Sequence, residues 1–434
     1  MEEIIGSGKL IQRKANASTV GKHDHLVIEM EEMIKSSRPL LSPGCCIYKV
    51  PDHFRKMNEE AYTPRVISMG PFHHGNEKLQ TMEKYKVRYL MDFMKRAKTN
   101  LEKLLSIIKD WEEKICECYA ETIEFSSDDF VKMILLDATF IIEYFLRNKF
   151  PKQWTDEDRI VLKPWLTARM QLDFLLLENQ LPFFIVEKLY ELVLVTNTIY
   201  RPFIEVTFCY FGFFNTQNKE SNQLQIMHFV DLLRSFYLPP PERILSKRKP
   251  DNKVEEIYSA TQLAEAGLTF RRSPSNCYLD LKYKDGVLEI PRFTLDNATE
   301  IYARNLMALE QCHYPREAYV TDYFFLLDFL IDTGKDVGFL ASKKILVNGL
   351  GDDNATFVNN LGTNVEYSSM NSEYCHLCRE LVKFYDNPWH RWKAILRRDY
   401  FSSPWRIAST AAAVILLVLT LVQAVCSIIS ILVP

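Results

Sequence analysis

The stretch SSDDFVKMILLDATFIIEYFL, residues 126–146, decides how this chain folds. The polar run Ser126–Asp129 supplies side chains that accept hydrogen bonds from the free N–H groups at a helix start. The residues that follow, Phe130–Leu146, are nearly all apolar, so a helix formed by them would bury most of its surface. We therefore predict a central helix over Phe130–Leu146, against which the other elements pack.

The segments on either side of this stretch also have helical spacing. Between Lys78 and Tyr119, apolar residues recur every three or four positions, which is typical of one long helix or of two helices joined by a bend. Trp165–Leu177 and Phe183–Leu194 form another apolar pair, and Pro182 can begin the second helix or kink a continuous one. The fold class is therefore mainly α.

The later part of the chain has a different composition. Residues 239–256 begin with three prolines and continue with many charged side chains, which is typical of a linker. We predict that they join a helical lobe at 25–238 to a second lobe at 257–390, and that residues 1–24 form a flexible arm. In the second lobe, apolar runs at 277–283 and 287–293 flank Lys284-Asp285-Gly286, which predicts a β-hairpin and a small sheet.

The C-terminal segment 407–434 contains no charged side chain. Within it, AAAVILLVLTLVQAVCSIISIL at residues 411–432 would span about 33 Å as a helix, which matches a hydrocarbon core of about 30 Å. The alternative is a helix buried in a soluble core, but such helices seldom stay apolar on every face. We predict a single transmembrane anchor, with the lipid bilayer as a partner.

Basic and aromatic residues precede this span at 391–406, and nothing basic follows it. The positive-inside rule therefore predicts that the large N-terminal portion lies in the cytosol, for the plasma membrane and for an endomembrane alike. The residues nearest the span that carry this argument are Arg397, Arg398, Trp405 and Arg406.

Composition argues against nucleic-acid binding. The chain is 47% hydrophobic and 25% charged, with a net charge of only −3, so it has no basic footprint for nucleic acid. Phosphate-binding loops, dinucleotide fingerprints and the common hydrolase motifs are absent from the sequence, so no cofactor is predicted.

Four residues are candidates for catalysis. Asp137 falls on the apolar face of the central helix, where a carboxylate must be paired or protonated. Glu178 precedes Pro182, and His73 and His74 lie in a turn between glycines. These groups could serve as general acid or base, or they could satisfy buried polar groups and join helices, which is the interpretation we favour.

One Cys-x-x-Cys pair, Cys375 and Cys378, is a candidate for metal binding. A structural zinc site needs a second pair of ligands at suitable spacing, and the nearby sequence does not supply one. The simpler interpretation places two thiols on one helix that leads to the membrane.

Several ordered blocks resemble the plant family catalogued as domain of unknown function 247, also described as uncharacterised protein family 0481. They cover the chain from about residue 46 to the C-terminus. The blocks are IYKVP at 47–51, SMGPFHHG at 68–75, LDATFIIE at 136–143, LLENQLPFF at 176–184, HFVDLLR at 228–234, SATQL at 259–263, GVLEIP at 286–291, RNLMALEQC at 304–312 and YVTDY at 319–323.

The resemblance implies a plant protein with a C-terminal anchor and an undefined biochemical activity. Some grass relatives are proposed as pollen-side determinants of self-incompatibility that recognise small secreted partners, which favours recognition over catalysis. Where the family often has Gly-Cys after the Leu-Asp of the third block, this chain has Ala138-Thr139, so a nucleophilic thiol is missing there.

Two functional hypotheses follow. The first is a membrane-tethered module that binds an unidentified protein partner, with residues 1–24 and 239–256 as variable contact surfaces. The alternative is an enzyme, namely a hydrolase that uses buried carboxylates such as Asp137 and Glu178 with a histidine from His73-His74. The enzyme hypothesis requires these groups to converge on one open pocket.

Overall fold

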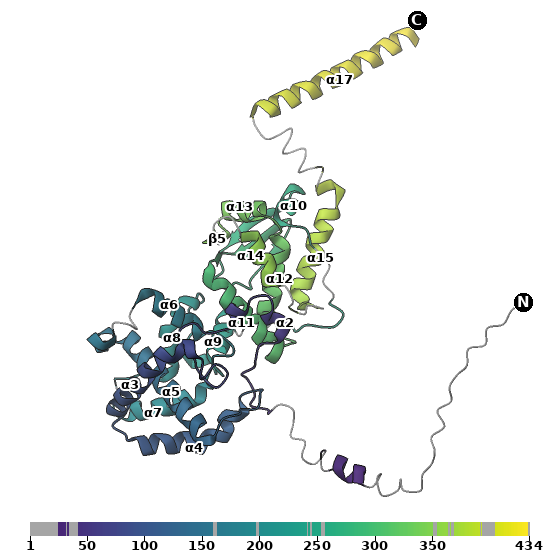
Figure 1. Ribbon diagram of the computed structural model, residues 1–434. Coiled ribbons are helices and arrows are strands. Elements are labelled where there is room, and N and C mark those ends of the chain that lie inside the picture. The colour runs from purple at the N-terminus through teal and green to yellow at the C-terminus, as the bar shows by residue number, and fades with distance from the viewer. Residues whose placement is uncertain are drawn as a thin grey trace, which may run out of the picture.

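The computed structural model describes residues 25–31, 33, 42–158, 163–196, 199–240, 242–243, 245–252, 257–349, 354–362, 365, 369–390, 392 and 404–432. Figure 1 shows a mainly helical body and a long C-terminal helix, α17 (Pro404–Leu432), apart from it. The mainly α fold class is confirmed. The predicted arm 1–24, Arg397 and Arg398 lie outside the described residues, as do the side chains of Trp405 and Arg406.

The predicted central helix is present as α5 (Ser127–Lys149). The Ser126 hydroxyl caps it by accepting a hydrogen bond from the Asp129 N–H at 3.2 Å. Phe145 lies at the centre of an aromatic cluster, and its ring stacks on Tyr210 with centroids 4.1 Å apart. The helices packed around α5 are α3 (Gln80–Ala97), α4 (Leu101–Glu117), α7 (Phe183–Thr196) and α8 (Phe203–Tyr210).

The amphipathic stretch 78–119 forms two helices joined by a bend, one of the two predicted arrangements. Helix α3 ends at Ala97, and Lys98 takes the left-handed conformation with φ at 48°. Asn100 then caps α4 by accepting a hydrogen bond from the Lys103 N–H at 2.9 Å. This bend lets both helices pack against α5.

The remaining elements complete the body. Its other α-helices are α2 (Asp52–Arg55), α6 (Pro164–Asp173), α9 (Phe229–Tyr237), α10 (Ala260–Glu265), α11 (Asn297–His313), α12 (Tyr319–Leu330), α13 (Gly334–Ser342), α14 (Asn354–Leu361) and α15 (Ser372–Asp386). Short 3₁₀ helices are η1 (Glu59–Ala61), η2 (Glu77–Leu79), η3 (Pro151–Gln153), η4 (Asp156–Asp158), η5 (Gly212–Phe214) and η6 (Ser221–Gln223).

The predicted hairpin is present. Strands β2 (Lys282–Lys284) and β3 (Val287–Pro291) pair antiparallel with Lys284 opposite Val287. Asp285 and Gly286 connect them with φ at 50° and 77°, the positive values that a two-residue hairpin turn of type I′ requires. Two parallel pairings were not predicted: β1 (Thr269–Ser273) with β3, and β4 (Phe293–Leu295) with β5 (Leu346–Asn348).

Helix α11 connects the earlier and later parts of the body. It packs against α6 and α9 as well as α12 and α14, and one hydrophobic core of the described residues extends from Cys45 to Phe384. Glu310 of α11 is fully buried, pairs with Arg234 of α9 at 3.0 Å, and accepts the Thr321 N–H of α12 at 2.7 Å. One carboxylate therefore joins three helices.

Part of the predicted linker contacts the body. Arg248 pairs with the buried Asp322 of α12 at 2.6 Å, and Asn252 donates a hydrogen bond to Ser372 at the start of α15 at 2.9 Å. Helix α15 itself is anchored in the core by Tyr374 and Phe384. The division into two lobes at 239–256 stays a prediction.

Candidate functional site

The predicted joint between α6 and α7 is a buried polar loop. Glu178, Asn179 and Gln180 are each at most 4% exposed. Asn179 accepts a hydrogen bond from the Met69 N–H at 2.6 Å and donates to the Ile67 carbonyl at 3.0 Å. Its side chain therefore binds a segment more than a hundred residues earlier in the chain.

Gln180 connects the same loop to α9. Its side-chain oxygen accepts the Phe229 N–H at 2.9 Å, and its amide nitrogen donates to the carbonyls of Phe174 and Leu176 at 2.7 and 2.8 Å. The break between α6 and α7 frees these carbonyls, and Gln180 satisfies them. We call residues 173–180 the polar joint.

Asp173 adds a third connection from the polar joint. Its carboxylate accepts the backbone N–H groups of Arg65, Val66 and Ile67 at 3.1, 2.7 and 2.9 Å. Burial raises the pKa of Asp173 to about 6, although the three N–H donors act in the opposite direction. Side chains of the polar joint thus bind the backbone of residues 65–67 and 69.

Asp137 lies on the other side of that segment. Its carboxylate pairs with the fully buried Lys86 ammonium at 2.6 Å and accepts the Gly70 N–H at 2.8 Å. Burial raises the pKa of Asp137, while the positive charge of Lys86 opposes this shift. Lys86 also donates to the Ser68 carbonyl at 2.7 Å, so Asp137 ties α5 to α3 and to the turn at 68–70.

Glu178 and His73 lie together. The Nε2 of His73 is 3.1 Å from one carboxylate oxygen of Glu178, which also contacts the Arg55 guanidinium, and the other oxygen accepts the Val50 N–H at 2.7 Å. Burial alone would raise the pKa of Glu178, but His73 and Arg55 outweigh it and the pKa lies below its usual range. His74 instead packs edge-on against Phe125.

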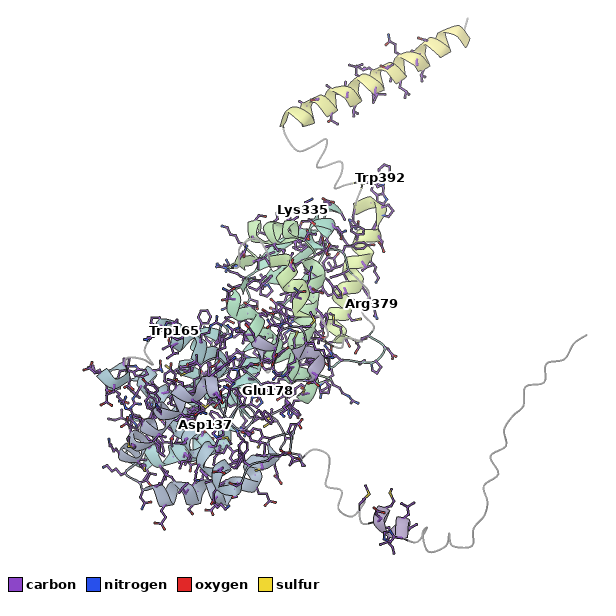
Figure 2. All side chains as sticks on the ribbon, in the orientation of Figure 1. Asp137, Trp165, Glu178, Lys335, Arg379 and Trp392 are labelled. Atoms are coloured by element: carbon purple, nitrogen blue, oxygen red, sulfur yellow. The ribbon has the colours of Figure 1, made fainter. Side chains whose placement is uncertain are left out.

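The candidate residues are therefore brought together only in part. Figure 2 shows Asp137 and Glu178 at separate positions within the body, and their carboxylates have different partners. Four cavities among the described residues have walls that are made of other side chains. A histidine–carboxylate pair can transfer a proton, but the pair here is also an anchor for the Val50 backbone.

The cysteine pair lies on α15. Cys375 and Cys378 form no disulfide, each is 2% exposed, and burial raises the pKa of Cys378 to about 12. Among the described residues, no group of three or more His, Cys, Asp or Glu side chains is arranged to hold a metal ion. The Cys378 thiol is a poor ligand and a poor nucleophile because it stays protonated.

Sequence reasoning missed Asp173, Lys86 and His228, of which the last two show what a pattern can and cannot signal. Lys86 lies on the apolar stripe of α3 with Met82, Tyr89 and Phe93, and a lysine in that register signals a buried acidic partner. His228 is fully buried, with Nδ1 accepting the Asp231 N–H at 3.3 Å to cap α9 and Nε2 3.0 Å from the Cys46 carbonyl oxygen. Nothing in the local pattern predicted its second contact.

Comparison with known proteins places the chain in a family. The model of the DUF247 family, described as plant protein of unknown function, matches residues 47–419, which include every residue of the polar joint. This chain belongs to the DUF247 family. It is 30% identical to the UPF0481 protein At3g47200 of Arabidopsis thaliana, covering 89% of this chain and 87% of the relative. It is 21% identical to the putative UPF0481 protein At3g02645 of the same species, with 87% and 89% covered.

No solved structure matches this DUF247 chain. The contacts of the polar joint and of Asp137 are consequently described from this chain alone. Each residue that they use falls within a block that carries the family resemblance or within the matched range 47–419. The family description itself names no activity.

A first prediction concerns Gly70. A methyl group there would come within 2.6 Å of the Gln180 carbonyl oxygen, and φ is +73°, whereas Gly75 has φ at +83° and open space. We expect Gly75→Ala to cost about 1 kcal/mol of the free energy of unfolding from backbone strain alone, and Gly70→Ala about 1–3 kcal/mol more. Urea unfolding of the full chain in detergent micelles measures both, and equal losses would contradict a tight contact at Gly70.

A second prediction concerns pH. Burial lowers the pKa of His228 to about 4, whereas the unfolded ring titrates near its ordinary value of 6.5. The unfolded chain therefore takes up a proton first as pH falls, and the stability contributed by the neutral ring, present above pH 6.5, is lost towards pH 4. The loss amounts to about 3 kcal/mol at roughly 1.4 kcal/mol per unit of pKa shift.

His228→Asn keeps a capping side chain without a titrating ring. We expect the free energy of unfolding of the wild type to fall more steeply than that of this variant between pH 6.5 and 4. Substitution of the exposed His376 by asparagine is the control and should follow the wild type. Parallel curves for wild type and His228→Asn would mean that His228 is not held neutral.

Proposed function

We propose that this chain is a single-pass membrane protein whose helical body binds a protein partner in the cytosol. Helix α17 carries the proposal: the window Ala408–Ser427 has a mean hydropathy of 2.2, and none of it is buried in the structure. Leu416 and Leu417 are each 67% exposed. Exposed apolar surface costs about 25 cal/mol per Å² in water, and a bilayer would remove that cost.

The residues before α17 support a cytosolic body. Trp389 and Trp392 are 80% and 68% exposed, and amphipathic rings in this position favour the headgroup layer of a membrane. Basic residues gather just before the span, at 391–406. The positive-inside rule then leaves the N-terminal portion on the cytosolic side.

An exposed apolar segment near the N-terminus supports protein binding. Residues 25–31 form a helical segment in which Leu26, Val27 and Met30, which lie on one side of the helix, are 54%, 50% and 49% exposed. None of the three belongs to the hydrophobic core of the described residues. Adjacent exposed apolar side chains of this kind mark contact sites, and this segment continues the predicted contact arm 1–24.

The engagement of the buried carboxylates favours binding over hydrolysis. Asp137 holds Lys86 and the Gly70 backbone, and Glu178 holds Arg55 and the Val50 backbone, so both are already used to position the chain.

We assign the contact surface to residues 1–31 and no longer include residues 239–256. Arg248 pairs with Asp322 and Asn252 donates a hydrogen bond to Ser372, so deletion of 239–256 would remove contacts that the body uses.

A third prediction tests the anchor. Leu416→Arg combined with Leu419→Arg places two charges at the middle of the span. Each charge raises the free energy of membrane insertion by about 2.5–3.5 kcal/mol. We expect the wild type to resist alkaline carbonate extraction and the double variant to be extracted. Val87→Arg with Met91→Arg, on the exposed face of α3, is the control and should stay with the membrane.

The same preparation tests orientation. In sealed microsomes, an N-terminal tag should be digested by added protease. Protection of the tag, together with glycosylation at Asn297 or Asn354, would place the body in the lumen and overturn the cytosolic assignment.

A fourth prediction tests the contact surface. With a biotin ligase fused to the N-terminus, Leu26→Ser, Val27→Ser and Met30→Ser together should reduce labelling of specific neighbours severalfold while leaving helix content unchanged. Val87→Ser with Met91→Ser removes two exposed apolar side chains from another helix and should have no effect. An unchanged set of labelled neighbours in the triple variant would argue against this segment as the contact surface.

A further inference from the structure

A cavity of about 380 Å³ lies where the earlier and later parts of the body meet. Its wall includes Gln171 of α6, Phe214 of η5, Tyr237 of α9, Tyr278, Tyr302 of α11 and Tyr323 of α12. A volume in this range suits a small organic molecule. Phe213, 83% exposed, also lines the cavity, which indicates an opening to solvent.

Aromatic rings dominate the wall. The ring of Tyr237 lies 5.2 Å from that of Tyr278 and 6.4 Å from that of Tyr302, and Phe214 packs edge-on against Tyr302 at 5.8 Å. Such rings offer faces and edges for a flat aromatic guest. The chemistry of the wall therefore favours an aromatic ligand over an aliphatic one.

The polar groups of the wall are not all satisfied. Tyr302 donates a hydrogen bond to the Thr299 hydroxyl at 3.0 Å, but the Tyr323 hydroxyl is buried and has no hydrogen-bond partner among the described residues. Tyr323 is 2% exposed and lines the same cavity as Tyr278 and Tyr302. A buried unpaired hydroxyl is costly, and a ligand oxygen could accept its hydrogen bond.

The charge of the wall restricts the ligand further. Asp296 is the charged residue of the lining, and one of its oxygens caps α11 by accepting the N–H groups of Ala298 and Thr299 at 3.0 and 2.9 Å. No lysine or arginine lines this cavity among the described residues. An anionic ligand would meet a carboxylate without a counter-charge, so a neutral molecule fits better.

We propose that this cavity binds a small neutral aromatic molecule bearing a carbonyl or hydroxyl oxygen, which accepts a hydrogen bond from the Tyr323 hydroxyl. Tyr323 is a ligand-binding residue in this proposal, and Gln171, Tyr237 and Tyr302 shape the site. The site is independent of the membrane anchor and of the contact segment at 25–31. Either proposal can fail without the other.

The test uses the full chain in lipid nanodiscs and 6-propionyl-2-dimethylaminonaphthalene, a neutral fluorescent aromatic ketone. Empty nanodiscs measure partition of the probe into lipid. With the wild type, we expect the fluorescence emission of the probe to gain a blue-shifted component that saturates with protein concentration and exceeds the lipid background. Its absence from a folded preparation would overturn the proposal.

Three variants locate the bound probe. Ala168 lies at an exposed position of α6 and lines the cavity, so Ala168→Trp should raise the dissociation constant of the probe at least tenfold. Thr167→Trp is the matched control, because Thr167 lines a neighbouring cavity but not this one, and it should bind as the wild type does. Tyr323→Phe should weaken binding about three- to tenfold, the range for one lost hydrogen bond.

Two further measurements separate ligand binding from a structural effect. Tyr323→Phe without probe should be at least as stable as the wild type, because it removes an unpaired hydroxyl. Methyl 2-naphthoate should displace the probe at least ten times more effectively than the 2-naphthoate anion. Equal displacement by the two, or unchanged binding in both Ala168→Trp and Tyr323→Phe, would overturn the assignment.

Discussion

The structure depends on one constraint: the break between α6 and α7 leaves polar groups deep in the body that water cannot reach. Asp173, Asn179 and Gln180 satisfy these groups and, in doing so, bind the backbone of residues 65–69 and the start of α9. An unsatisfied buried polar group costs about 1–3 kcal/mol of folding free energy. A different packing of these segments would break several of these hydrogen bonds at once and would be destabilised accordingly. Apolar packing around α5 supplies the driving force, and the polar joint selects which packing is adopted.

Local patterns in the sequence predicted local structure well. The cap before α5, the helical spacing of 78–119 and the Asp285-Gly286 turn each depend on neighbouring residues, and all three are present. The parallel pairing of β4 with β5 brings together residues about fifty positions apart, and no short-range pattern encodes it. His228 and Cys46 are likewise distant in sequence. For Lys86 the signal was present, as a lysine within an apolar stripe.

The candidate site shows the same division. Asp137 is buried, as its position on the helix predicted. The predicted convergence with Glu178 and a histidine is found only in part. Asp137 binds the Gly70 backbone, whereas Glu178 pairs with His73. A carboxylate that is buried and hydrogen-bonded to backbone serves the fold first. Membership of the DUF247 family adds no reaction, since the family is described as one of unknown function. Recognition at a membrane surface is thus the interpretation that the anchor and the occupied carboxylates jointly favour.

The position of helix α15 limits how far the body can lie from α17. Tyr374 and Phe384 fasten it in the core, and only residues 387–403 separate it from α17. A fully extended chain of that length reaches at most about 60 Å. With α17 in a bilayer, the body would stay within a thin layer next to the membrane surface, where a partner held on the same membrane has a high effective concentration. Even a contact too weak to persist in solution could then be occupied for much of the time.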